Sequence, residues 1–590
     1  MKLSCSYSVL WLLALMFSGS AIAQTAPTNT ASVDKIFSDV QKRGSPGCAV
    51  GVYRDGKMLY AKGYGLASVE LNVPISPQTV FDIGSTSKQF TATSILLLEK
   101  QGKLSLQDDI RKYIPELPDY SKNGGPKITI LNLLNHTSGI RDYLALLELS
   151  GVNIDSVTTD EDALAIVARQ QNLNFTPGSD FLYSNSGYFL LSLIVKRVSG
   201  MTLREFAAQN IFGPLQMTHT MFRDDHTKLI PNRALAYDPG DKSGYKLNVS
   251  YFEQLGDGAV HTSVEDLLKW DENFYSAQVG GKNLMSELQE RGKLTNGKVL
   301  EYAKALFIGD YRGLATVRHG GAWGGYRAEL LRFPQQHFSV ACLCNLANAN
   351  PEKRAEKVSE VFLSSLMKPL DKAKSGAPAG STGPEVSLAS AQLSAVTGMY
   401  RNEKGGNIAR VSITDGKPQM EIFGSTFKMR SLSPTEFALV DFPVDAKLSF
   451  ELNGNQGSRV MNVTGDEAVA ATYRRVTEFS PSASELSTFV GDFTSEELGV
   501  IYRLQVVSGK LNLVGISEPS GIPRTGIPVP NPLRPTINDE FELSSVGVNL
   551  HFMRNAAHEI TGFDLGAGRS QGILFVRVAE QGVQPHSSGF

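Results

Sequence analysis

A short stretch near the beginning of the chain combines a hydroxyl and an amine at a spacing that suits nucleophilic catalysis. Ser85 and Lys88 precede an apolar helical segment that contains Phe90, Ile95 and Leu96. If a helix begins near Ser85, residues three apart lie on one face of it. A lysine covered by apolar side chains loses its proton more readily and can act as a general base. We therefore expect Ser85 to be a nucleophile and Lys88 to be its base.

The same stretch has a simpler explanation. Ser and Thr are preferred N-cap residues, so the hydroxyls of residues 85–87 could do no more than begin a helix. The spacing Ser-x-x-Lys also occurs by chance roughly twice in a chain of this length. A phosphate-binding loop is excluded because the stretch lacks its glycine-lysine spacing. A helix start would also place backbone N–H groups and the positive end of the helix dipole beside a developing oxyanion.

A second candidate group follows in the middle of the same half of the chain. Tyr183 and Asn185 are two apart, so in an extended segment both side chains project to one side. Tyr183 could accept or relay a proton if a nearby lysine lowers its pKa. Asn185 could bind Lys88 and a substrate carbonyl. The alternative is that Tyr183 is a core aromatic residue packed with Phe181 and Tyr188.

A glycine-rich segment later in the chain is the third candidate. His319, Gly320, Gly321 and Ala322 form part of it, and glycines beside a strand let a ligand approach the backbone closely. His319 would face such a ligand as a hydrogen-bond donor, and the Ala322 N–H would stabilise an oxyanion. The alternative is a glycine-rich turn with an incidental histidine.

These groups need a scaffold, and strand-like segments occur at both ends of the region that contains them. Hairpin-like strands at 47–53 and 58–61 precede the helical segments, and strands at 330–333 and 338–345 follow them. This order predicts an α+β domain, at 24–370, whose sheet is completed by its two ends.

Beyond a linker at 371–390, which is rich in Ala, Gly, Ser and Pro, the chain changes to short alternating strands. The segment 393–400 resembles 486–493, and the two begin 93 residues apart. A repeat of that length predicts two small β-barrels, at 391–478 and 479–580. One larger β-domain is the alternative.

The first residues are typical of a secretory signal. A basic start, an apolar run and an Ala-x-Ala site predict a signal peptide at 1–23 that is cut after Ala23. The apolar run is shorter than the about 20 residues that a membrane anchor needs. We therefore expect a secreted protein, periplasmic if the source is a diderm bacterium, with no transmembrane anchor.

Composition and cysteine content narrow the function further. The 590 residues carry a formal net charge of -2, which gives no electrostatic footprint for nucleic acid, so small molecules or short peptides are the expected partners. After cleavage three cysteines remain, Cys48, Cys342 and Cys344, with no Cys-x-x-Cys pattern that would indicate zinc. We expect buried thiols; a disulfide from Cys48 to Cys342 or to Cys344 stays open.

The three candidate groups occur in an order that resembles the serine β-lactamase and penicillin-binding-protein superfamily. The likeness covers residues 30–367 and includes similar segments at 128–139 and 256–268. The branch most similar is the S12 peptidase group, with class C β-lactamases, DD-peptidases, D-aminopeptidases and esterases. The resemblance implies an α/β catalytic domain with a mainly antiparallel sheet and a site between that sheet and an α-helical part. It implies no metal or cofactor.

The resemblance also implies acyl-enzyme chemistry. Ser85 attacks a carbonyl, Lys88 and Tyr183 move the proton, and the N–H groups of Ser85 and Ala322 bind the oxyanion. Water then releases the acid. Gly320 and Gly321 belong to the substrate-binding segment.

This sequence departs from the β-lactamases of the branch at one position. Their third motif usually begins with a lysine that binds the substrate carboxylate, whereas His319 is mostly neutral at pH 7. Efficient β-lactam hydrolysis is therefore less expected, although Arg318 or Arg327 could supply positive charge. We assign His136 a structural role, hydrogen-bonded at a helix end.

The two barrels resemble those of D-aminopeptidases that carry two lipocalin-like domains. In that architecture a barrel loop can reach the active site and restrict substrate length, and 515–532 is the most loop-like candidate here. The expected function is a secreted serine hydrolase that acts on D-amino-acid-containing peptides, as an aminopeptidase or DD-carboxypeptidase, or on small esters. The alternatives are a penicillin-recognising or β-lactamase-type protein and a catalytically weak protein that binds cell-wall fragments.

Overall fold

The computed structural model describes residues 30–579, except 123, 154, 241–243, 370–384, 404–405, 423, 441, 443–445, 454–456, 466–470 and 544–546. The predicted signal peptide and most of the predicted linker lie outside the described residues. Within the described part of the chain, no helix has the length and apolar character needed to cross a bilayer.

An eight-stranded antiparallel sheet forms the centre of the N-terminal domain. Its order is β10-β11-β12-β13-β14-β15-β1-β2. Strands β1 and β2, from the beginning of the domain, therefore lie beside β15, the last strand of the domain. This confirms the prediction that the two ends of the domain complete one sheet. The strands are β1 (Cys48–Arg54), β2 (Lys57–Tyr64), β10 (Arg291–Lys293), β11 (Val299–Ala303), β12 (Leu306–Tyr311), β13 (Leu314–Trp323), β14 (Tyr326–Phe333) and β15 (Phe338–Cys344).

Helices cover both faces of this sheet. α1 (Thr30–Ile36) and α10 (Pro351–Leu363) lie over one face, and α8 (Val264–Ser276) packs on β1 and β15 from the other. The central strands are therefore buried on both sides and consist almost entirely of apolar residues.

The helical part of the domain packs around α2 (Lys88–Lys100) and α6 (Asn185–Ser199), which contact each other. Most residues of these two helices are buried, which explains their many apolar side chains. The other helices are α3 (Ile130–Leu134), α4 (Tyr143–Leu149), α5 (Asp160–Ala168), α7 (Leu203–Ala207) and α9 (Gly281–Leu288), and the short strands β5 (Phe81–Asp82), β6 (Met221–Phe222) and β9 (Val260–Thr262) form a small sheet beside them.

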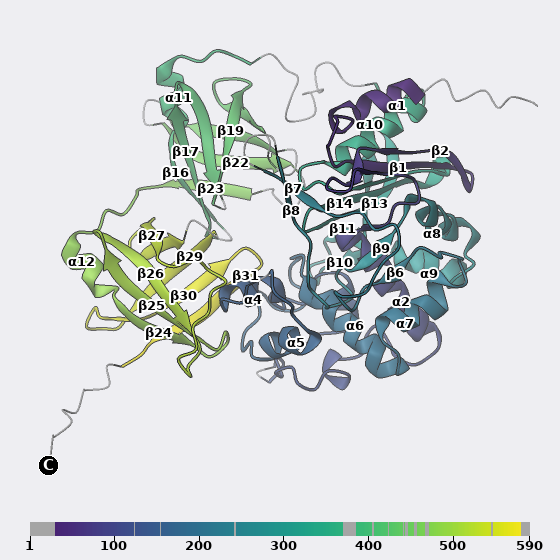
Figure 1. Cartoon of the computed structure of the whole chain (residues 1–590). Helices are drawn as coiled ribbons and strands as arrows, with labels where there is room; N and C mark the ends of the chain where they lie inside the picture. The colour runs from purple at the N-terminus through teal and green to yellow at the C-terminus, as the bar shows by residue number, and fades with distance from the viewer. Residues whose placement is uncertain are drawn as a thin grey trace, which may run out of the picture.

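Two closed eight-stranded barrels follow, and each is preceded by a short helix (Figure 1). This confirms the duplicated barrels and excludes one larger β-domain. Barrel 1 comprises α11 (Ser390–Val396), β16 (Gly398–Asn402), β17 (Ile408–Thr414), β18 (Lys417–Ile422), β19 (Ser425–Ser431), β20 (Glu436–Val440), β21 (Ala446–Leu452), β22 (Ser458–Gly465) and β23 (Ala471–Val476). Barrel 2 comprises α12 (Ala483–Thr488), β24 (Gly491–Ser495), β25 (Val500–Val507), β26 (Lys510–Ser517), β27 (Asn531–Pro535), β28 (Glu540–Leu543), β29 (Val548–Arg554), β30 (Ile560–Ala567) and β31 (Ser570–Arg577).

The repeat extends to single backbone positions. Gly398 and Gly491 begin the first strand of each barrel with φ angles of 148° and 149°. A Cβ atom on Gly398 would meet the guanidinium of Arg475, and one on Gly491 would meet that of Arg577. In both barrels, then, an arginine of the closing strand covers the glycine that starts the first strand.

Ion pairs and hydrogen bonds join the second barrel to its neighbours. Arg141 of the N-terminal domain lies 2.7 Å from Glu497 of barrel 2, and both side chains are nearly inaccessible. The Tyr502 hydroxyl donates to the carbonyl of Leu149 at 2.6 Å, so barrel 2 lies against the end of α4, as Figure 1 shows. Between the barrels, arginines pair with glutamates at Arg401–Glu540, Arg410–Glu542 and Arg534–Glu421.

The expectation of three buried thiols is wrong for two of them. Strands β1 and β15 pair so that Cys48 lies opposite Cys344, and a disulfide joins the two residues. Cys342 keeps a buried thiol 3.8 Å from the Cys344 sulfur, and burial raises its pKa to about 12. The sequence left the partner of Cys48 open because both later cysteines face one side of β15 and only the strand register distinguishes them.

Replacement of Cys48 and Cys344 by alanine is expected to lower the free energy of unfolding by roughly 2–5 kcal/mol, because the bond links residues 296 positions apart. Urea unfolding followed by circular dichroism measures the change. Cys342→Ala is the matched control, since its thiol is not bonded. An equal loss in the control and in the double variant would contradict a stabilising bond.

Candidate active site

A cavity of about 1550 Å³ lies where the N-terminal domain meets the two barrels. Such a volume can hold a small ligand or a short peptide. The candidate residues that line it are Ser85, Tyr183, Asn185, Arg318, His319, Gly320, Gly321, Ala322 and Arg327. Barrel 1 adds Phe442, Lys447 and Thr464, and barrel 2 adds Arg569.

The hydroxyls at residues 85–87 do not cap a helix. A 3-10 turn, η2 (Gly84–Ser87), leads into α2, and neither start has a side-chain cap. Ser87 accepts the N–H of Val260 at 3.0 Å, and Thr86 donates to the carbonyl of His319 at 3.1 Å. Both therefore fasten the turn to its neighbours, and Ser85 is the hydroxyl that lies beside Lys88.

Lys88 is completely buried, and its amine is surrounded by oxygen atoms. The Nζ atom lies 3.0 Å from Ser85 Oγ, 3.0 Å from Asn185 Oδ1 and 2.6 Å from the carbonyl oxygen of Asp257. Burial lowers the pKa of Lys88 to about 7, although the Asp257 carboxylate opposes the shift, and the nearby Arg569 lowers it further. A substantial fraction of Lys88 is therefore neutral at physiological pH and able to accept a proton.

Tyr183 completes the group around Lys88. The Nζ atom lies 4.9 Å from the centroid of the Tyr183 ring, and the Tyr183 hydroxyl is buried without a hydrogen bond of normal geometry. Burial raises its pKa, and the neighbouring Ser85 hydroxyl only partly offsets this. The shift is opposite to the lowered pKa on which the expected proton-acceptor role depends. The phenol stays protonated at neutral pH and can donate or pass on a proton.

The glycine-rich segment lies in β13 and packs directly on η2. A Cβ atom on Gly321 would lie 1.9 Å from the carbonyl oxygen of Ile83, and one on Gly84 would lie 2.7 Å from the nitrogen of Ala322. Only glycine permits this approach of two backbones. The glycines thereby bring the Ala322 backbone next to the turn that carries Ser85, as an oxyanion site requires.

His319 is held in a chain of buried hydrogen bonds. The Ser184 N–H donates to His136 Nδ1 at 3.1 Å, so the His136 proton is on Nε2, which donates to Tyr302 at 3.1 Å. Tyr302 then donates to His319 Nε2 at 3.2 Å, and His319 Nδ1 donates to the carbonyl of Gly320 at 2.6 Å. Burial lowers the pKa of His319 to about 3, so the ring is neutral.

This arrangement differs from the expectation that His319 donates to a ligand. Its one N–H is already used by Gly320, so it orients β13 instead. The predicted structural role of His136 agrees with the hydrogen bonds it makes just after α3. Tyr302 had no signal in the sequence, because nothing but the fold brings it between the two histidines.

The two arginines suggested as sources of positive charge are engaged. Arg318 forms ion pairs with Glu329 at 3.2 Å, with Glu356 at 3.4 Å and with Glu352. Arg327 Nη1 donates to the backbone carbonyls of its own hairpin at 2.7 and 2.8 Å.

The barrel segment proposed to reach the site is not the one that does. Among the described residues, none from 515–532 lines the cavity; Gly526 instead donates to the carbonyl of Gly151 at 2.9 Å, on the outside of the domain. The tip of the β30–β31 hairpin enters the cavity and carries Arg569. Its two-residue turn looks like any tight hairpin, so no local pattern favours it over a longer, proline-rich segment.

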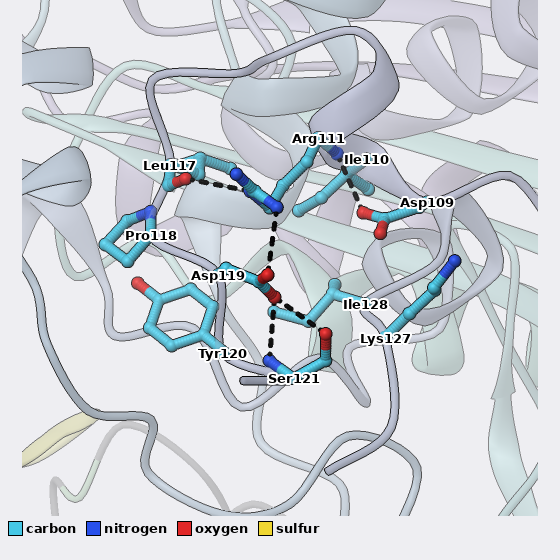
Figure 2. Close-up of a pocket in the computed structure, with 10 residues that line it drawn as sticks. All are labelled: Asp109, Ile110, Arg111, Leu117, Pro118, Asp119, Tyr120, Ser121, Lys127 and Ile128. Carbon is cyan, nitrogen blue, oxygen red and sulfur yellow. Dashed lines mark hydrogen bonds and ion pairs between the residues drawn. The ribbon is translucent and has the colours of Figure 1, made fainter. Parts of the chain in front are cut away.

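A second, far smaller cavity lies away from Ser85 and is shown in Figure 2. It has a volume of about 10 Å³ between Ile110 and Tyr120, and an ion pair from Arg111 to Asp119 spans it at 3.4 Å. That space suits at most one water molecule.

Tyr302→Phe is expected to lower the free energy of unfolding by about 1–3 kcal/mol, because both buried histidines lose a hydrogen-bond partner. Tyr183→Phe is the matched control: the hydroxyl it removes has no such partner, so the change should stay below about 0.5 kcal/mol. Urea unfolding of both variants measures the difference. Equal losses would show that the hydrogen-bonded chain contributes nothing.

Comparison with known proteins agrees with this geometry. The family model described as Beta-lactamase matches residues 33–361. A D-aminopeptidase of Gluconobacter oxydans is 28% identical over 305 residues, which are 52% of this chain and 56% of the relative. Protein flp of Staphylococcus aureus is 30% identical over 342 residues, which are 55% of this chain and 65% of the relative. The chain thus spans less than two thirds of the length of either relative.

A solved structure extends the similarity beyond the first domain. The octameric penicillin-binding protein homologue of Pyrococcus abyssi has a TM-score of 0.53 at 21% identity, over 75% of this chain and 99% of that one. At this identity the likeness is one of fold. Because the family model covers more than half of the residues, the chain belongs to the β-lactamase family.

Proposed function

We propose that this protein is a serine hydrolase that forms an acyl-enzyme on Ser85. The observation that carries the proposal is the position of the Lys88 amine, buried, partly neutral at pH 7 and 3.0 Å from the Ser85 hydroxyl. A protein that only binds ligands has no use for a desolvated amine beside a hydroxyl, since burial of that amine costs stability.

The protonation states of Lys88 and Tyr183 support the following order of steps. Neutral Lys88 takes the Ser85 proton as Oγ attacks the substrate carbonyl, and the N–H groups of Ser85 and Ala322 stabilise the oxyanion. Tyr183, protonated and next to both, passes a proton to the leaving group and is reprotonated from Lys88. Asn185 orients the Lys88 amine through its Oδ1 atom. Water then attacks the ester carbonyl by the same route and releases Ser85.

Peptides that contain D-amino acids, or small esters, are the substrates we propose. The similarity to a D-aminopeptidase supports the peptide, and neutral His319 in place of a fixed cation disfavours β-lactams. A penicillin-recognising or weakly catalytic cell-wall-binding protein is the second candidate, favoured by the fold shared with a penicillin-binding protein homologue. The amino-terminal signal-like sequence supports a secreted, periplasmic location.

One panel of purified protein with nitrocefin, p-nitrophenyl esters, D-alanine p-nitroanilide and a D-Ala-D-Ala peptide distinguishes these substrate classes. Ser85→Ala is expected to lower hydrolysis roughly 1000-fold or more and to abolish labelling by fluorophosphonate and penicillin probes. Ser87→Ala is the control, since its hydroxyl bonds Val260 rather than Lys88. A Ser85→Ala variant that still carries label would remove the assignment of the nucleophile.

The pH dependence follows from the lowered pKa of Lys88. Below about pH 7 the amine is protonated and cannot accept the Ser85 proton, so kcat/KM for p-nitrophenyl acetate should rise with pH and level off above about 8. Lys88→Arg stays protonated and should lose roughly 100- to 10,000-fold of the activity. Lys100→Arg, at the exposed end of the same helix, should keep the wild-type profile. Retained activity in Lys88→Arg would exclude Lys88 as the base.

A further inference from the structure

The hairpin tip of barrel 2 brings an arginine into the active-site cavity. Ala567 pairs with Ser570, so Gly568 and Arg569 form the two-residue turn between β30 and β31. The guanidinium carbon of Arg569 lies 5.6 Å from the ring centroid of Tyr183, the ring that also lies 4.9 Å from the Lys88 amine. A residue from the end of the chain therefore stands next to the base and the phenol.

The N-terminal domain holds this turn by its backbone. Asn174 donates through Nδ2 to the Arg569 carbonyl at 2.8 Å and accepts the N–H of Gln571 through Oδ1 at 2.9 Å. Arg141 donates to the carbonyls of Gln571 and Gly572 at 2.9 and 2.8 Å. Four hydrogen bonds from two side chains thus fix the backbone of the turn that carries Arg569.

The guanidinium of Arg569 has N–H donors that are available to a ligand. Its one ion pair with a described residue joins Nε to the Asp142 carboxylate at 3.6 Å, and 38% of the side chain is exposed. Asp142 already accepts the N–H groups of Asn185 at 2.8 Å and Leu144 at 3.2 Å. The terminal nitrogens make no hydrogen bond to another described residue. They form a planar fork that matches the two oxygens of a carboxylate.

The other arginines of the cavity bond mainly to the protein itself. Arg318 is surrounded by glutamates and Arg327 bonds its own hairpin, as described above. Arg223 donates to the backbone carbonyls of Ser250 and His226. His319, which replaces the cation of related enzymes, is neutral. Lys353 and Lys447 also line the cavity. Arg569 differs from them by its place over the Tyr183 ring, which also lies next to the Lys88 amine.

We propose that Arg569 binds a carboxylate of the substrate and makes this enzyme selective for anionic peptides or esters. The inference rests on the proposed acyl-enzyme function and specifies its substrate class. A charge-assisted pair in a partly buried cavity typically favours the charged ligand by roughly 10- to 100-fold over its neutral isostere. The effect should lie mainly in KM, because the carboxylate is bound in the ground state as well as in the transition state.

The test uses two matched pairs of substrates, one with the charge on the acyl side and one with it on the leaving side. The first pair is mono-p-nitrophenyl glutarate and the corresponding glutaramate. The second is N-acetyl-D-alanyl-D-alanine and its C-terminal amide. For each pair the ratio of kcat/KM, anionic over neutral, is measured at pH 9. Because both members of a pair meet the same enzyme variant, the protonation state of the general base cancels in the ratio.

Wild type is expected to prefer the anionic member of at least one pair, and Arg569→Gln should reduce that preference by roughly 10-fold or more. Arg569→Lys keeps the charge but not the fork and should lie between the two. Arg503→Gln is the matched control, because Arg503 pairs with Asp492 on the exposed face of the same barrel. It should leave both ratios at the wild-type value.

Two outcomes would overturn the assignment. One is a wild-type enzyme that prefers the neutral member of both pairs, and the other is an unchanged ratio in Arg569→Gln. Fluorophosphonate labelling of Arg569→Gln at Ser85 shows that the site is still folded. A lower anionic-over-neutral ratio in this variant is then not caused by unfolding. Absence of both hydrolysis and labelling in wild type would instead remove the proposed function itself.

Discussion

The need to keep an amine out of water and still hydrogen-bonded governs the centre of this structure. Lys88 is completely buried, and each of its N–H groups needs an acceptor. Ser85 in η2, Asn185 at the start of α6 and the carbonyl of Asp257 before β9 supply them. Three segments distant in the sequence thus converge on one nitrogen. These acceptors satisfy the N–H groups, and burial lowers the pKa of Lys88 to about 7, so that part of it is the neutral amine that can act as a base.

Much of this centre could be predicted from the sequence, because the chemistry resides in short motifs. Ser85 and Lys88 share one helical turn, and the strands at both ends of the domain complete one sheet. The rest depends on contacts that no local pattern encodes. Tyr302 joins two histidines only after β11 has paired, and the partner of Cys48 follows from the register of β1 against β15. The arginine on the β30–β31 turn is the extreme case, since a tight hairpin resembles any other until its neighbours are known.

Barrel 2 contributes to the cavity through a hairpin turn, and its interior is filled with aromatic side chains. In barrel 2 the rings of Phe489, Phe541, Phe552 and Phe563 pack against one another with centroids 4.8–5.7 Å apart, which makes the interior a solid aromatic core. A filled barrel is rigid and can hold a turn at a fixed distance from its own axis. The buried ion pair between Arg141 and Glu497 holds barrel 2 against the N-terminal domain. In barrel 2 the eight-stranded architecture thereby supports the turn that carries Arg569.

The clamp that Asn174 forms on the β30–β31 turn has a consequence for biogenesis. The cavity combines Ser85 with a hairpin almost 500 positions later in the sequence, so it is complete only after barrel 2 has been synthesised and has docked. Until then Ser85 and Lys88 lack the β30–β31 turn that completes the cavity. The arginine that we propose as the substrate-selecting residue therefore joins the site only after the nucleophile and the base have been synthesised.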